Sequence, residues 1–202
     1  MKTVVLNEAL KIWDKISVGE KLSEVKFELE VHKKLLQIFQ VGDYYYYIFN
    51  VRDVQFDFMS KEIETVLGYN PDEVNVSSFI NNIHPDDQPW FLNIESKVAE
   101  FFSKLSLEQI LNYKVRYDYR IRKSNGEYIR ILQQTVTIQH NETGGVLRAL
   151  GVHTDISHLK IEGKPVLSFI GLNGEPSFID VDIKKVFPLP SEMLTGRERE
   201  IL

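Results

Sequence analysis

The sequence contains no cysteine. This absence excludes disulfide bonds, thiolate metal sites, a cysteine nucleophile and the flavin photochemistry that depends on cysteine. The sequence also lacks any apolar run near the ~18 residues that a membrane-spanning helix requires. At the N-terminus, Asn7 and Glu8 interrupt the chain before the apolar core of a signal peptide can form. We therefore expect a cytoplasmic protein without a membrane partner.

Basic residues are fewer than acidic ones, with 24 Lys and Arg against 29 Asp and Glu and a net charge of -5. A nucleic-acid-binding surface is basic, so most of this chain is not expected to contact nucleic acid. The 202 residues are 43% hydrophobic and 26% charged, as in ordinary soluble globular proteins. This length suits one domain with appendages, or one large and one very small domain.

The spacing of apolar residues predicts an α+β fold. Residues 7–40 form an amphipathic helix pair in this prediction, whose apolar stripe either covers a sheet or contacts a second copy of the chain. The following region predicts a five-stranded antiparallel sheet with short helices on one face. The expected strands are 44–51, 54–59, 113–122, 127–140 and 146–154, and the expected helices are 61–67 (capped by Ser60), 76–83 and 88–105. A separate small β-hairpin is expected near the C-terminus, with strands 166–170 and 176–181.

Five motifs follow one another between residues 46 and 157. They are residues 46–50, 63–73, 83–87 (Ile83-His84-Pro85-Asp86-Asp87), 119–128 and 151–157. Together they resemble a PAS domain of the subclass that ends in a PAC motif. The resemblance implies a sensory or dimerisation module that passes a signal to an attached output domain. It also implies structural or signal-relay roles for His84, Pro85, Asp86, Gly126 and Asp155.

The C-terminal motif is Leu194-Thr195-Gly196-Arg197-Glu198-Arg199-Glu200-Ile201-Leu202. Thr195 and Glu198 have the spacing of a capping box, which satisfies two backbone amides where a helix starts. The motif, with Thr195, Arg197 and Glu198, resembles the opening of a LuxR-type helix-turn-helix, and a simple capped helix is the alternative. The resemblance to a helix-turn-helix implies that only a C-terminal domain contacts DNA. Apart from its start, that domain is expected to be missing from this sequence.

These observations divide the chain into four parts. They are an N-terminal helical cap or dimer element (1–40), a PAS sensor domain (41–160), a linker with a small hairpin (161–192) and the start of a truncated helix-turn-helix (193–202).

Two sets of polar residues are candidates for a metal site or for acid–base catalysis. His153, Asp155 and His158 are metal-ligand types, but His158 lies beyond the expected strand and no glutamate general base accompanies them. His84 and Asp86 are an acid–base candidate, but a proline turn and a helix start require the same residues. The sequence has no nucleophile elbow, phosphate-binding glycine loop or His-Glu-x-x-His pattern. We predict no catalytic or metal site and therefore no enzyme.

Two further patterns concern ligands. The even-numbered face of the strand 113–122 carries Lys114, Arg116, Arg120 and Arg122, interrupted by Asp118, which favours a solvated or partner-binding face over a phosphate site. Aromatic residues of the PAS-like region should mostly form the core. The resemblance implies haem, flavin, a small metabolite or no ligand, so the cofactor stays unassigned. His84 is not expected to bind haem, because it matches a structural motif.

The favoured hypothesis is the sensory and dimerisation region of a bacterial transcriptional regulator. This region would pass a ligand or partner signal to a C-terminal LuxR-type DNA-binding domain. We expect a homodimer that takes a small-molecule ligand or responds to a partner. The alternative is a PAS module of a sensor kinase, or a module used only for protein interaction.

Overall fold

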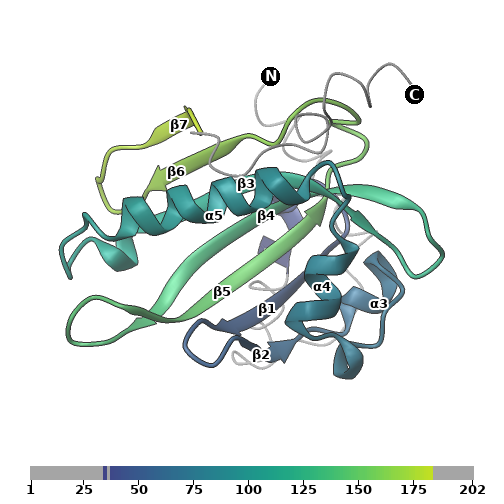
Figure 1. Cartoon of the computed structure of the whole chain (residues 1–202), viewed down its shortest axis with the longest axis horizontal. Helices are drawn as coiled ribbons and strands as arrows, with labels where there is room; N and C mark the ends of the chain where they lie inside the picture. The colour runs from purple at the N-terminus through teal and green to yellow at the C-terminus, as the bar shows by residue number, and fades with distance from the viewer. Residues whose placement is uncertain (1–33, 36, 184–202) are drawn as a thin grey trace, which may run out of the picture. The chain divides into compact units, whose positions relative to one another are not determined.

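The computed structural model of the chain describes residues 34, 35 and 37–183 (Figure 1). The helices predicted before residue 34 and the C-terminal motif with Thr195, Arg197 and Glu198 lie outside the described residues. The chain divides into two compact units, Met1–Phe39 and Gln40–Leu202. The sheet, the helices that cover it and the cavity all belong to the second unit.

One antiparallel sheet of seven strands, in the order β2-β1-β5-β4-β3-β6-β7, forms the centre of this unit. Five of its strands confirm the predicted ones: β1 (Tyr44–Asn50), β2 (Gln55–Met59), β3 (Tyr113–Arg122), β4 (Tyr128–His140) and β5 (Val146–Asp155). The other two, β6 (Leu167–Gly171) and β7 (Phe178–Val181), are the predicted hairpin. The prediction that this hairpin is separate is wrong, because β6 pairs with β3 and satisfies its otherwise open edge.

Three helices lie between β2 and β3 in the chain and cover one face of the sheet (Figure 1). They are α3 (Glu62–Val66), α4 (Val76–Asn82) and α5 (Gln88–Phe102), with short 3-10 turns η1 (Pro71–Glu73) and η2 (Ile110–Asn112). A capping box between Asn75 and Ser78 starts α4. The prediction that Ser60 caps the first helix is wrong, because its hydroxyl accepts a hydrogen bond from the backbone N–H of Tyr46 (3.1 Å). Ser60 therefore fixes the start of this region to β1.

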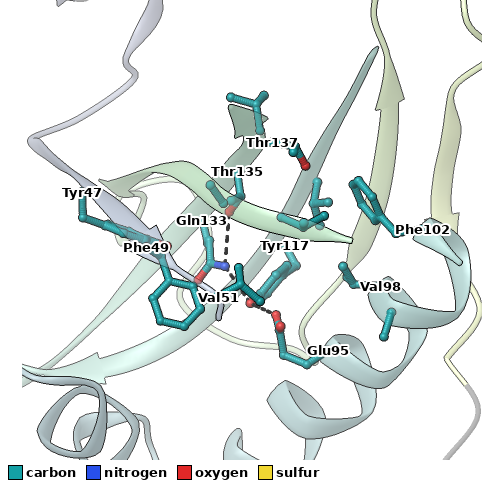
Figure 2. Close-up of a pocket in the computed structure, with 15 residues that line it drawn as sticks. Tyr47, Phe49, Val51, Glu95, Val98, Phe102, Tyr117, Gln133, Thr135 and Thr137 are labelled. Carbon is teal, nitrogen blue, oxygen red and sulfur yellow. Dashed lines mark hydrogen bonds between the residues drawn. The ribbon is translucent and has the colours of Figure 1, made fainter. Parts of the chain in front are cut away.

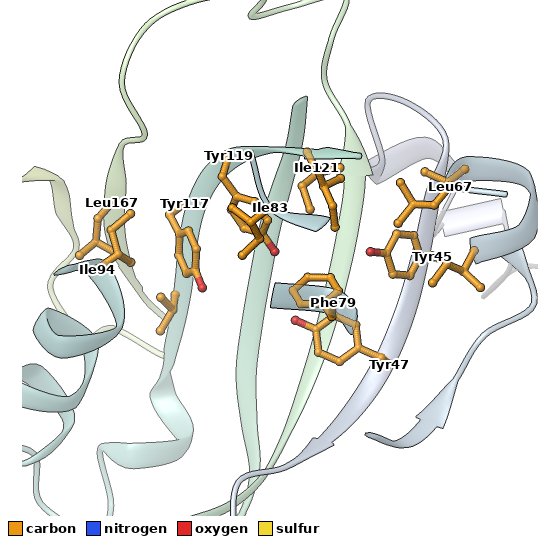
Figure 3. Close-up of a cluster of buried hydrophobic side chains, with 14 of the residues drawn as sticks. Tyr45, Tyr47, Leu67, Phe79, Ile83, Ile94, Tyr117, Tyr119, Ile121 and Leu167 are labelled. Atoms are coloured by element: carbon orange, nitrogen blue, oxygen red, sulfur yellow. The ribbon is translucent and has the colours of Figure 1, made fainter. Parts of the chain in front are cut away.

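The core lies between the helices and the sheet, and β3 shows why. Its odd-numbered residues from Tyr113 to Ile121 are all buried, as the alternating pattern predicts. Aliphatic residues from the helices and turns, including Ile63, Leu67 and Ile94, complete the same cluster (Figure 3). Burial of these large side chains is the main source of stability for such a domain.

The opposite face of β3 differs from the solvated row that the sequence predicts. Asp118 is buried, and its carboxylate pairs with Arg130 of β4 and with Lys160 (Nζ–Oδ1 3.0 Å). The backbone N–H of Val166 also donates to this carboxylate (3.1 Å). Hydrogen bonds thus attach residues 160–166 to β3 and β4. The sequence pattern missed this arrangement because the partners of Asp118 lie far from it along the chain.

Two glycines meet specific backbone or packing requirements. Gly126, in the hairpin between β3 and β4, has a φ angle of 91°, which side chains with a Cβ rarely adopt. Gly151 in β5 has a different constraint, because a Cβ there would lie 2.2 Å from Cζ of Tyr47. The ring of Tyr47 therefore occupies the space that a side chain at position 151 would need.

Candidate functional site

A cavity of about 320 Å³ lies between α5 and the sheet (Figure 2). Its walls are mostly apolar: Phe49, Val51, Val98, Ala99, Phe102, Val115, Val136, Val146 and Ala149. A few polar side chains also line it: Tyr47, Glu95, Tyr117, Gln133, Thr135 and Thr137. Sites for small molecules are typically apolar hollows with a few placed polar groups, in a size range of about 300–1,000 Å³. This cavity has that character and lies at the small end of the range.

Helix α5 forms one wall of the cavity with residues spaced three or four apart. Glu95, Val98, Ala99 and Phe102 therefore share one face of the helix. Phe101 contacts the hairpin instead.

The aromatic contact between α5 and the hairpin is a tight stack. Phe101 stacks on Phe169 of β6, with ring centroids 3.9 Å apart and planes 10° from parallel. It also meets Phe178 of β7 edge-on, at a centroid distance of 5.8 Å. The same helix thus contacts both the cavity and the hairpin.

A chain of hydrogen bonds connects the buried centre of the sheet to the cavity. The hydroxyl of Tyr45 lies 2.6 Å from Nδ1 of His153, and Nε2 of His153 lies 3.0 Å from Oε1 of Gln133. Nε2 of Gln133 donates to the hydroxyl of Tyr117 (2.7 Å), which donates to Oε1 of Glu95 (2.5 Å) (Figure 2). We call these five residues the hydrogen-bond chain.

The last two donors of this chain point toward Glu95: Gln133 donates to Tyr117, and Tyr117 donates to Glu95. Nε2 of His153 lies within hydrogen-bond distance of both Gln133 and the hydroxyl of Tyr47 (3.1 Å), so the direction of the bonds at His153 depends on its tautomer. Tyr119 also donates to the amide oxygen of Gln133 (2.8 Å). Glu95 is therefore the acceptor at the end of the chain.

Burial keeps the histidine and tyrosines of this chain neutral. His153 has no exposed surface, and desolvation lowers its pKa from 6.5 to about 3. Desolvation likewise raises the pKa of Tyr45, Tyr117 and Tyr119 well above the ordinary value. Near neutral pH these groups act as fixed hydrogen-bond donors and acceptors rather than as charges.

Glu95 is the acidic side chain in the cavity wall. Its side chain is accessible to solvent, but the surrounding protein desolvates the carboxyl group and raises its pKa. The hydrogen bond from Tyr117 opposes this effect and lowers the pKa by a smaller amount. Among the described residues, Tyr117 binds Oε1 and none binds Oε2. One carboxyl oxygen is thus available to a ligand.

The predicted positions His84, Pro85 and Asp86 form the turn that leads into α5. Nδ1 of His84 accepts from the backbone N–H of Asp86 (3.2 Å), and the imidazole ring contacts Tyr128 with centroids 4.6 Å apart. None of these residues lines the cavity beside Glu95. Their place in the structure is a turn, and their role in signalling stays a prediction.

Asp87 is a structural residue whose partner the sequence did not reveal. It occupies the N-cap position of α5, but its side chain makes no capping bond. Its buried carboxylate instead accepts from Arg120 at the backbone N–H (2.8 Å), Nε (3.0 Å) and Nη2 (2.7 Å). Burial raises the pKa of Asp87, but the bonds from Arg120 outweigh burial and lower it. This pair fixes the start of α5 to β3, across a sequence separation that no local pattern spans.

The remaining predicted positions lie elsewhere. Gly126 is in the β3–β4 hairpin, and Asp155 ends β5, where Oδ1 accepts from the backbone N–H of Ser157 (2.8 Å). Of the three metal-ligand candidates, His153 is buried in the hydrogen-bond chain and His158 is exposed. In the part of the chain that the structure describes, no three metal-ligating side chains converge.

The cavity residues do not fit a haem. Both ring nitrogens of His153 already lie within hydrogen-bond distance of tyrosine or glutamine partners, so neither is available as an axial ligand. His84 is not part of the cavity wall. The small volume and the single carboxyl group fit a small organic molecule instead.

Comparisons with known proteins concern the second unit. Residues 56–153 match the family model described as PAS fold. The N-terminal domain of a Marinobacter aquaeolei diguanylate cyclase with PAS/PAC sensor is 23% identical, with a TM-score of 0.47, over 57% of this chain and 96% of that one. A sensory box histidine kinase/response regulator from Burkholderia thailandensis is 21% identical, with a TM-score of 0.43, over 66% and 86%. No curated protein is significantly similar to the chain.

Within the described ranges, no helix combines the length and the apolar character needed to cross a membrane.

Proposed function

We propose that this chain, in which residues 56–153 form a PAS domain, senses a small molecule and passes the signal to an output domain. The cavity between α5 and the sheet is the observation that carries this proposal. Its apolar walls would hold the body of a ligand, and the hydrogen-bond chain that ends at Glu95 would orient a polar group. The proposal assigns no catalytic role to the chain.

Helix α5 is the element that would carry the signal. Glu95 and Phe102 face the cavity, while Phe101 stacks on Phe169 of the hairpin. A ligand that displaces α5 would therefore also displace the hairpin that leads toward the C-terminus. Packed interfaces of this kind favour discrete alternative arrangements over gradual deformation.

The identity of the output domain is a second part of the proposal. We favour a LuxR-type DNA-binding domain after the sensor, on the strength of the motif at residues 194–202 with Thr195, Arg197 and Glu198. We also propose that the PAS domain ends in a PAC motif and that the protein is cytoplasmic. A sensor-kinase output explains the PAS domain equally well. Sequencing the complete gene separates the two: a helix-turn-helix after the PAS domain supports the regulator, and a helical hairpin with a phosphorylatable histidine supports the kinase.

A homodimer is part of the regulator proposal. The sheet face opposite the helices carries apolar side chains on adjacent strands, among them Ile48 paired with Leu150, Tyr46 paired with Val152, and exposed Phe58. Apolar residues gathered on such a face suit contact with a second copy. Size-exclusion chromatography with light scattering should give a dimer mass that falls when Phe58 is replaced by glutamate. A monomer mass for the unmodified chain would refute the dimer.

The ligand proposal is tested on the purified chain. Native mass spectrometry with an absorbance scan should reveal a copurified small molecule, or addition of small apolar probes should raise the melting temperature. The substitution Ala99→Leu, which fills the cavity, should abolish either effect. Ser96→Leu is the matched control, because Ser96 is exposed on α5 and does not line the cavity. Failure of every probe to bind, with no copurified mass, would remove the sensing proposal.

A further inference from the structure

The polarity of the hydrogen-bond chain limits the kind of ligand that the cavity can take. At the cavity end of the chain, Gln133 donates to Tyr117, Tyr117 donates to Glu95, and Glu95 receives the last hydrogen bond. Oε2 of Glu95 lacks a partner among the described residues. A carboxylate only accepts hydrogen bonds, so a complementary ligand must supply a donor.

The charge of the cavity wall restricts the ligand further. Among the lining residues, Glu95 is the acidic group and none is lysine, arginine or histidine. An anionic ligand would therefore meet a like charge without a compensating cation. A cationic donor would instead neutralise Glu95, and charge-assisted hydrogen bonds are stronger than those between neutral groups.

We propose that the cavity binds a small primary amine with an apolar, preferably aromatic, body, and that its ammonium group donates to Oε2 of Glu95. This inference rests on the proposed small-molecule sensing and adds the chemical class of the ligand. The aromatic wall residues Phe49 and Phe102 would contact the body of the ligand. The ammonium group would lie at the end of the hydrogen-bond chain, beside Tyr117.

The pH dependence of binding follows from the groups around Glu95. The titratable groups that face it directly or through the chain are four tyrosines and a histidine: Tyr45, Tyr47, Tyr117, Tyr119 and His153. All five are neutral near neutral pH, because burial raises the pKa of the tyrosines and lowers that of the histidine. Burial also raises the pKa of Glu95, so amine binding must ionise whatever fraction of it is protonated. Binding should therefore release protons and strengthen as the pH rises toward neutrality.

The test compares three probes of similar size on the full chain by isothermal titration calorimetry: phenethylamine, phenethyl alcohol and phenylacetate. Phenethylamine should bind about tenfold or more tightly than phenethyl alcohol, as expected for a charge-assisted hydrogen bond, and phenylacetate should bind most weakly. Titrations in buffers of different ionisation enthalpy should show proton release with the amine. This second measurement needs no variant.

Two substitutions on α5 locate the effect. Glu95→Gln should remove the preference for the amine while retaining affinity for the alcohol. Glu100→Gln should leave both affinities unchanged, because Glu100 is an exposed carboxylate on the same helix that pairs with Lys97 and Lys104 away from the cavity. If Glu95→Gln does not fold, the comparison of the three probes with the unmodified chain still decides the question.

The outcomes distinguish failure of the amine assignment from failure of the proposed sensing function. Equal or tighter binding of phenethyl alcohol or phenylacetate would overturn the amine assignment while supporting a ligand cavity. Amine binding that survives Glu95→Gln at full strength would also overturn it, because the ammonium group would then lie elsewhere. If none of the probes binds and no copurified molecule is found, both the amine assignment and the sensing function fail.

Discussion

His153 makes the stability of this fold sensitive to mild acid. Its folded-state pKa is about 3, against an ordinary value of 6.5, because the side chain is fully buried. Between these values the unfolded chain binds a proton that the folded chain does not. The stabilising contribution is therefore complete above about pH 6.5 and is lost progressively as the pH falls toward 3. At about pH 5, one and a half pH units below the unfolded value, the loss is roughly 2 kcal/mol.

The substitution His153→Gln tests this reasoning, because glutamine does not titrate. The variant should be less stable than the unmodified chain at neutral pH, by about 1–3 kcal/mol, since the hydrogen bonds to Tyr45 and Gln133 are perturbed. The difference should shrink by roughly 2 kcal/mol at about pH 5, because only the unmodified chain loses the histidine contribution. His158→Gln, which changes an exposed histidine five positions away, should follow the unmodified chain.

The assay is urea unfolding followed by far-ultraviolet circular dichroism between about pH 7.5 and pH 5. Glu95, whose pKa burial raises, is present in both proteins, so the difference between the unmodified chain and His153→Gln isolates the histidine. A His153→Gln variant with the same pH dependence as the unmodified chain would refute the argument, because the titrating group would then be another residue.

Three further predictions concern contacts that position the cavity. Gly151→Ala should lower the free energy of unfolding by about 1–3 kcal/mol in urea titrations, because its Cβ would force the ring of Tyr47 to move; a neutral effect would show that the ring has room. Asp87→Asn should cost about 2 kcal/mol at neutral pH by leaving Arg120 without its carboxylate partner. That cost should disappear in acid, since the depressed pKa of Asp87 contributes stability only above its unfolded value, and a pH-independent cost would contradict the ion pair. Phe101→Ala should cost about 3 kcal/mol and expose the β6–β7 hairpin in hydrogen exchange, and unchanged protection there would show that the stack does not hold the hairpin.

The elements themselves were predictable, because local patterns encode them. The alternation in residues 113–122 gave the bounds of β3 and its buried face correctly, and Gly126 marked the hairpin that follows. What the sequence did not reveal is pairing across long separations. The bond from Arg120 to Asp87 and the pairing of β6 with β3 both join distant segments, and no spacing rule connects them.

The candidate site also depends on contacts between residues that are distant in the sequence. The sequence motif assigned His84 and Asp86 structural or signal-relay roles and indicated no role for Glu95, which lies in an ordinary amphipathic helix. Only the fold places Glu95 beside Tyr117 and at the end of a chain that begins at Tyr45. The chemical importance of Glu95 comes from its surroundings, not from its neighbours in sequence.

Helix α5 connects the two parts of the proposed mechanism. Its cavity face carries Glu95, and Phe101, less than two turns further along the same helix, stacks on the hairpin. No loop lies between these two residues, so a displacement at the carboxylate is transmitted along continuous helical backbone. An ammonium ligand would change the charge of the site at Glu95, and a neutral ligand of equal shape would not. If the helix carries the signal, hydrogen exchange in β6 and β7 should therefore respond to phenethylamine more than to phenethyl alcohol at equal occupancy. An equal response to both ligands would show that the signal does not depend on the charge of the ligand.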